Sequence, residues 1–160
     1  MNEKKQIFLA PEPEIMTIIT VMVVLAAAIF IIFWAVRFYK RKKMGFLDDM
    51  EGHEFEYFCA KLLKDSGFID VEVTKGSGDY GVDILAEKDG VTYAVQCKCY
   101  TDAVGVKAVQ EAYAGRDYYD RMVGAVMTNQ YFTAPAVQAA KKLKILLWDR
   151  GYLEGIMEEK

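Results

Sequence analysis

Two short motifs place a carboxylate, an amide and an ammonium group within reach of one another. The carboxylate is Asp83, and the other two groups belong to Gln96 and Lys98. Between them, Asp89-Gly90 separates two apolar or β-branched runs, which predicts a two-residue type I′ turn and a β-hairpin. Carboxylate and amide oxygens are ligands for Mg²⁺, and an ammonium group offsets phosphate charge. This combination is typical of metal-dependent phosphodiester cleavage.

The hairpin register decides whether the three side chains meet. If the turn is two residues long, Lys88 pairs with Val91, and counting outward brings Asp83 opposite Gln96. Directly opposed Cβ atoms lie roughly 4.5–5.5 Å apart, and strand alternation places Gln96 and Lys98 on one face. The alternative is an exposed polar face with a surface Asp–Lys pair worth about 0–1 kcal/mol.

A glycine-rich run, residues 75–81, precedes the carboxylate. Its three glycines allow the backbone to approach a ligand or to adopt positive φ, which favours a site. Gly76-x-Gly78-x-x-Gly81 also matches the dinucleotide-binding pattern, but that pattern needs a helix next. Residues 82–87 are typical of a strand instead, so no helix N-terminus is available for a pyrophosphate. A dinucleotide site is therefore disfavoured.

Taken together, these residues resemble the Mrr-like restriction endonucleases, a branch of the PD-(D/E)xK nuclease superfamily. The resemblance covers about residues 52–148. It rests on Gly52-x-x-Phe55-Glu56, Gly78-Asp79-x-Gly81-Val82-Asp83, Gln96-x-Lys98 and Val104-Gly105-Val106-x-x-Val109-Gln110-Glu111. It implies a DNA endonuclease that restricts foreign or modified DNA.

The resemblance also implies residue roles. Asp83 matches the metal-binding aspartate, Gln96 the variable acidic or amide position, and Lys98 the motif lysine, while Glu56 matches a helix glutamate beside the centre. Asp83, Gln96 and the backbone carbonyl of Cys97 would hold Mg²⁺, with Mn²⁺ as a substitute. Because Gln96 stands where many relatives carry glutamate, metal affinity should be lower unless Glu56 compensates.

Charge is less favourable to DNA binding. The chain has 20 basic and 23 acidic residues, of which residues 1–43 hold 7 and 3, so residues 44–160 hold 13 and 20 and carry a net charge of −7. Duplex binding relies on basic residues, so we expect a local basic edge, with Lys75, Ser77 and Lys107 as DNA contacts. Gln110 and Glu111 follow the motif, but a solvated helix face is favoured for both.

The second large feature is an uncharged run, Ile15–Val36, of 22 residues. At 1.5 Å per residue it spans about 33 Å, enough to cross a bilayer. Basic residues crowd positions 37–43, which predicts a single-pass cell-membrane protein with a cytoplasmic C-terminal domain. A cleaved signal peptide would have a shorter apolar core and basic residues before it. The expected divisions are an extracytoplasmic N-terminus 1–14, a transmembrane helix 15–38, a basic juxtamembrane linker 39–47 and a nuclease domain 48–160.

Apolar periodicity and turn residues predict the remaining elements. After the transmembrane helix we expect the order α-β-β-β-α-β-α-β, an α/β fold with a restriction-endonuclease-like mixed sheet flanked by helices. The expected elements are a helix capped by Asp48 or Asp49 and running to about Lys64, a strand 69–73, the hairpin, a helix 104–119, a strand 122–128, a helix capped by Thr133 and running to about Lys142, a strand 143–148 and a helical turn or two from Asp149.

Several alternatives remain open at this level. Cys59, Cys97 and Cys99 form no CxxC pair and His53 stands apart, so neither a zinc site nor a disulfide is favoured. A non-catalytic nucleic-acid-binding or membrane-scaffold module could share the fold, and a junction or flap nuclease could share the site. A homodimer would allow both strands to be cut, and an unidentified membrane or specificity partner is a further expectation.

Overall fold

The computed structural model describes residues 13–43, 45–75 and 80–158, in two compact units, residues 1–43 and 44–160. The described part of the first unit, residues 13–43, forms the helix α1 (Pro13–Lys43), so helical structure continues into the basic stretch expected as a linker. Its Pro13–Val36 part is long and apolar enough to cross a membrane. The hydroxyls of Thr17 and Thr20 donate to carbonyls four residues earlier, at 2.9 and 2.8 Å, so these polar groups are satisfied within the helix.

The second unit is built on a five-stranded sheet in the order β1-β2-β3-β4-β5. The first three strands are antiparallel neighbours, whereas β3, β4 and β5 run parallel because a helix connects each to the next. The strands are β1 (Ile69–Val73), β2 (Ile84–Lys88), β3 (Val91–Lys98), β4 (Val123–Thr128) and β5 (Ile145–Trp148); the helices are α2 (Gly52–Asp65), α3 (Val106–Tyr118), α4 (Ala134–Leu143) and α5 (Arg150–Glu158). The expected order is confirmed.

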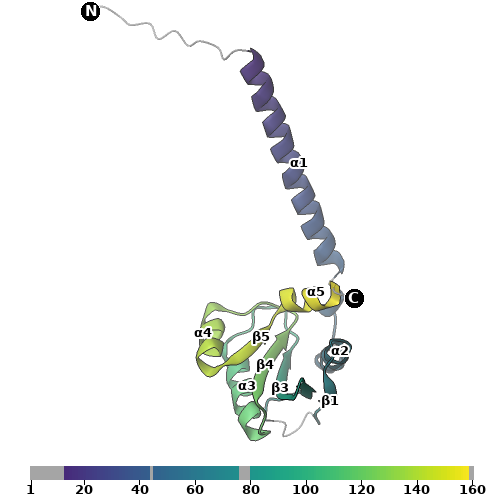
Figure 1. Ribbon diagram of the computed structural model, residues 1–160, viewed down its shortest axis with the longest axis vertical. Helices are drawn as coiled ribbons and strands as arrows, with labels where there is room; N and C mark the ends of the chain where they lie inside the picture. Colours follow the sequence, from purple (N-terminus) through teal and green to yellow (C-terminus); the bar gives the residue numbers. More distant parts are fainter. Residues whose placement is uncertain (1–12, 44, 76–79, 159–160) are drawn as a thin grey trace, which may run out of the picture. The chain divides into compact units, whose positions relative to one another are not determined.

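Helices cover both faces of this sheet, with α3 and α4 on one side and α2 on the other (Figure 1). On the α2 face, buried Phe55 and Leu63 belong to the same cluster as Ile84 and Met127 of the sheet, together with Leu153 of α5. The opposite face has its own apolar cluster, formed by α3, α4 and the strands β4 and β5. This three-layer arrangement explains why the central strands are rich in buried apolar residues.

The start of α2 differs from the expectation. The N-cap is Glu51, which forms a capping box with Glu54, rather than Asp48 or Asp49. By contrast, α4 begins as predicted: the Thr133 hydroxyl accepts from Ala136 N at 3.4 Å, and proline lies in the first turn. The sequence identified a capping residue correctly where proline marked the helix start, and misplaced it where several acidic residues were available.

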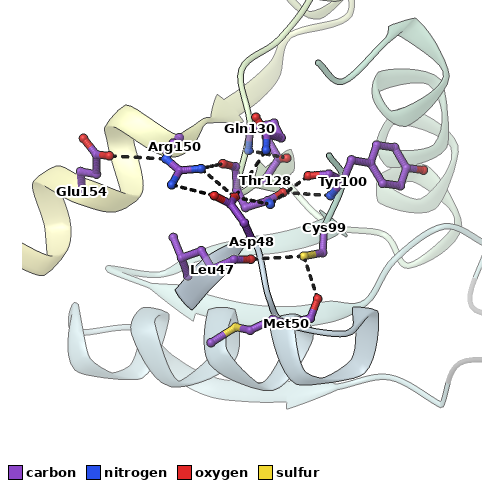
Figure 2. Close-up of polar contacts among 10 residues, drawn as sticks. Leu47, Asp48, Met50, Cys99, Tyr100, Thr128, Gln130, Arg150 and Glu154 are labelled. Carbon is purple, nitrogen blue, oxygen red and sulfur yellow. Dashed lines mark hydrogen bonds and ion pairs between the residues drawn. The ribbon is translucent and has the colours of Figure 1, made fainter. Parts of the chain in front are cut away.

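Asp48 instead holds the segment before α2 to the rest of the domain (Figure 2). Its carboxylate accepts from Arg150 Nη1 at 2.7 Å and from Asn129 Nδ2 at 3.1 Å. Nearby, the Cys99 thiol donates to the carbonyls of Met50 and Leu47, at 3.3 and 3.5 Å. Leu47 itself is fully buried in the core, although the sequence placed it in the linker. Residues 45–50 are therefore fixed against the segments that directly follow β3 and β4.

Candidate nuclease site

The predicted hairpin brings two residues of the motif together. Its register pairs Ile84 with Val95, and Lys88 with Val91. Asp89 and Gly90 both have positive φ, +55° and +76°, as a type I′ turn requires. One residue before β2, the Asp83 carboxylate accepts a hydrogen bond from the Gln96 side-chain amide, so these two side chains meet, as predicted.

The Asp83 carboxylate is held by two donors at the end of β3. Its Oδ2 accepts from the backbone N–H of Cys97 at 2.6 Å and from the side-chain amide of Gln96. The same amide nitrogen lies 3.3 Å from the Cys97 carbonyl oxygen. Both side chains are buried, with 9% of Asp83 and 4% of Gln96 exposed. The amide N–H thus links the two oxygens that the sequence nominated as cation ligands.

The other amide oxygen, Gln96 Oε1, has no hydrogen-bond partner among the described residues although it is buried. Buried acceptors rarely go unpaired. Turning the amide by half a rotation would direct this oxygen to the point between Asp83 and Cys97, where a cation would stabilise three converging oxygens. A carboxylate, an amide and a carbonyl are a ligand set suited to a hard divalent cation.

Lys98 enters the site from β3 but pairs with helix α3. Its Nζ lies 2.8 Å from Glu111 Oε2, and only 18% of the side chain is exposed. Burial lowers the pKa of Lys98, but the hydrogen bond and charge of Glu111 outweigh it, so the pKa lies above the ordinary value. The expectation that Glu111 occupies a solvated helix face is wrong, whereas Gln110 is exposed as expected.

Glu56 has a different environment. It extends from α2, where its Oε2 lies 2.8 Å from His53 Nδ1.

The Cys97 thiol points toward the same side of the sheet as Glu56. A hydrogen bond with Cys59, and then burial, raise the pKa of this thiol, and the charges of Asp83 and Glu56 add to that rise. Cys59 and Cys97 both belong to the core cluster, as expected.

The predicted DNA contacts lie at the periphery. Lys75 is exposed, and Lys107 is 89% exposed with its Nζ 3.7 Å from Glu111 Oε1. Ser77 lies outside the described residues. Over the described ranges, no cluster of three or more His, Cys, Asp or Glu side chains could hold a metal ion. The Gln96 amide and the Cys97 carbonyl are the neutral oxygen donors that lie beside Asp83.

A mixed five-stranded sheet flanked by helices, with a D…QxK arrangement at the end of its hairpin, defines the restriction-endonuclease-like class of fold. The sequence matches the restriction endonuclease family model Mrr_cat over residues 47–157, and the chain belongs to this family. No curated protein matches the chain in sequence.

Three solved structures share this fold. One is a protein of unknown function, AF1548 (TM-score 0.56, 23% identity, covering 65% of this chain and 64% of that one). Another is the DNA modification-dependent restriction endonuclease AspBHI (TM-score 0.61, 20% identity, 75% and 35%). The third is the MspJI restriction endonuclease in complex with a 27-mer oligonucleotide (TM-score 0.58, 19% identity, 73% and 30%). The chain spans less than two thirds of each of these proteins.

Proposed function

We propose that the chain is a membrane-anchored endodeoxyribonuclease that hydrolyses phosphodiester bonds with a divalent cation, Mg²⁺ or Mn²⁺. The observation that carries the proposal is the contact of the Gln96 amide with the Asp83 carboxylate and the Cys97 carbonyl. These groups converge in a buried site at the end of the hairpin, and membership of the restriction endonuclease family supports nuclease chemistry.

Each residue has a role that follows from its position. The Cys97 N–H donates to Asp83 Oδ2 and holds the carboxylate in place. In this proposal the Asp83 carboxylate would hold the cation together with two neutral oxygens, those of the Gln96 amide and the Cys97 carbonyl. When bound, the cation would lower the pKa of the attacking water and polarise the phosphoryl oxygen. The ammonium group of Lys98 offsets phosphate charge as it develops and orients the water. Glu56, on the α2 side of the sheet, would contribute its negative charge to the electrostatic field at the cleavage centre.

DNA is the proposed substrate, with Lys75, Ser77 and Lys107 as contacts to its backbone. AspBHI is described as modification-dependent and MspJI is described in complex with an oligonucleotide, so modified DNA is the first substrate to test and restriction the first biological role. The acidic balance of residues 44–160 predicts weak, strongly salt-dependent binding. A second copy of the chain, or a specificity partner, would strengthen binding and allow both strands to be cut.

The membrane is the proposed location. Residues 15–36 would cross the bilayer, and the basic residues 37–43 would keep the nuclease domain in the cytoplasm. An uncharged helix of this length with no buried surface of its own needs an apolar environment, which lipid supplies.

The proposal is tested with the full-length chain purified in detergent. Methylated plasmid, unmethylated plasmid and a branched DNA junction are each incubated with the chain and Mg²⁺, Mn²⁺ or EDTA. The variants are Asp83→Asn and Lys98→Met, and the matched controls are Asp102→Asn and Lys61→Met, which change exposed residues of the same types.

We expect cation-dependent cleavage by the unaltered chain and both controls, and loss of cleavage in both site variants. Cleavage by Asp83→Asn at the unaltered rate would overturn the assignment of the site. Binding of DNA and cation with no cleavage of any substrate would instead favour the non-catalytic module, and cleavage confined to branched DNA would favour a junction or flap nuclease.

A further inference from the structure

Helix α3 brings to the site a carboxylate that lies outside the D…QxK motif. We propose that Glu111 is a positioning residue for the cleavage reaction, because it fixes the ammonium group of Lys98 in the geometry that cleavage needs. This inference rests on the proposed function and adds to it a residue that acts through Lys98 rather than on the DNA.

The ion pair is short and largely shielded from water. Lys98 Nζ lies 2.8 Å from Glu111 Oε2, with 18% and 29% of the two side chains exposed. The other oxygen, Oε1, lies 3.7 Å from Lys107 Nζ, whose side chain is 89% exposed. A partly buried lysine is stable only with a partner, because the lost hydration must be replaced. Of the two lysines beside Glu111, Lys98 is therefore the one that depends on it.

The backbone around Glu111 is fixed by close packing against the segment that leads to Asp83. Gly81 has φ +79°, and a Cβ there would lie 2.9 Å from Glu111 Cβ and 3.0 Å from Gln96 Oε1. The stem of Glu111 is thus pressed against Gly81 beside the Gln96 amide. Since the start of this side chain cannot shift freely, its carboxylate presents a fixed partner to Lys98.

Glu56 cannot replace Glu111 in this role. Its carboxylate lies against His53 on α2, and its charge acts on Cys97, whose side chain faces the α2 side of the sheet. Strand alternation directs Lys98 to the opposite side, toward α3. The two glutamates therefore serve different faces of β3, and Glu111 is the one in contact with a residue of the cleavage centre.

If Glu111 were removed, Lys98 would interact with other charged groups. The negative charge of Asp83 also acts on Lys98, so without Glu111 the ammonium group would be drawn toward the carboxylate that the cation needs. Misplacement of a reacting or charge-stabilising group by about 1 Å costs up to about a hundredfold in rate. Glu111 prevents this by offering Lys98 a partner that is not a proposed cation ligand.

The test uses the full-length chain in detergent with Glu111→Gln, which preserves shape, and Glu111→Asp, which preserves charge but withdraws the carboxylate by one methylene. The control is Glu72→Gln, an exposed glutamate on β1. The first measurement is the rate at which an amine-reactive acetylating reagent labels Lys98, read by peptide mass spectrometry against Lys61 of the same molecule. Circular dichroism checks that each variant is folded.

We expect Lys98 to be labelled several-fold faster in Glu111→Gln than in the control, and kcat for DNA cleavage to fall about a hundredfold with little change in KM. For both the labelling rate and kcat, Glu111→Asp should give values between those of Glu111→Gln and the Glu72→Gln control. Unchanged labelling of Lys98, or unchanged kcat, would overturn the proposal. Loss of Mn²⁺ binding as complete as in Asp83→Asn would also overturn it, because Glu111 would then be a cation ligand.

The labelling measurement separates this inference from the function on which it rests. If the unaltered chain and Glu72→Gln cut no DNA, the proposed function fails. The labelling rate still decides whether Glu111 fixes Lys98, since it does not depend on turnover.

Discussion

A glycine-to-alanine substitution in α3 tests how tightly this helix packs on the segment leading into the site. A Cβ on Gly115 would lie 2.2 Å from Val82 Cγ2 and 3.0 Å from the Tyr80 carbonyl oxygen. Alanine in a helix normally gains about 1 kcal/mol over glycine, whereas overpacking a core costs about 1–3 kcal/mol. At a contact this short the upper end of that cost applies, so we expect a net loss of about 2 kcal/mol.

The structure also provides the matched control. Gly155 lies in α5 with nothing within 4 Å of the position a Cβ would take, so Gly155→Ala should stabilise the domain by up to about 1 kcal/mol. The same change at two helical glycines is therefore expected to act with opposite sign. A double variant, Gly115→Ala with Val82→Ala, removes the clashing methyl group and should show favourable coupling of about 1 kcal/mol or more.

Urea unfolding of the full-length chain in detergent gives these values. Trp148 is 6% exposed in the core, and in a Trp34→Phe background it is the remaining tryptophan, so its fluorescence reports the domain. Stabilisation by Gly115→Ala equal to that of Gly155→Ala would refute the close approach of α3 to Val82. Because Val82 precedes Asp83, we also expect Gly115→Ala to slow cleavage, and the double variant to recover part of the loss.

The remaining predictions concern pH, packing and the membrane. The pKa of Cys97 is raised in the folded state, so the folded protein holds the thiol proton more tightly than the unfolded protein does. The contribution of this thiol to the free energy of unfolding is therefore complete below about pH 8.5 and is lost as the pH rises further. Cys97→Ala should flatten the alkaline decline in urea midpoints. Trp148→Ala should cost about 3–5 kcal/mol in urea unfolding followed by circular dichroism, because this variant lacks the reporting tryptophan. Asp48→Asn should cost about 1 kcal/mol, discounted because the Asp48 side chain is 41% exposed. Deletion of residues 13–36 should abolish flotation with lipid vesicles.

Local sequence was sufficient for the hairpin and for several helix boundaries. Asp89-Gly90 restricts the turn to two residues, and strand alternation then sets which side chains share a face, so the meeting of Asp83 and Gln96 followed without any tertiary information. The proline after Thr133 marked the start of α4 for a similar reason, since it acts within one helical turn. The helix α1 could also be predicted from neighbouring residues alone, because its uncharged run is continuous in the sequence.

The partners of charged side chains required the tertiary structure. Glu111 was expected to be an exposed helix residue and Asp48 a helix cap. In the structure, Glu111 on α3 pairs with Lys98 at the end of β3, and Asp48 pairs with Arg150 at the start of α5. Sequence periodicity tells which face of an element is apolar, but not which distant charge lies over its polar edge. Which charges meet depends on how closely α3 and α5 approach the ends of the strands. The packing of the two apolar layers sets that distance.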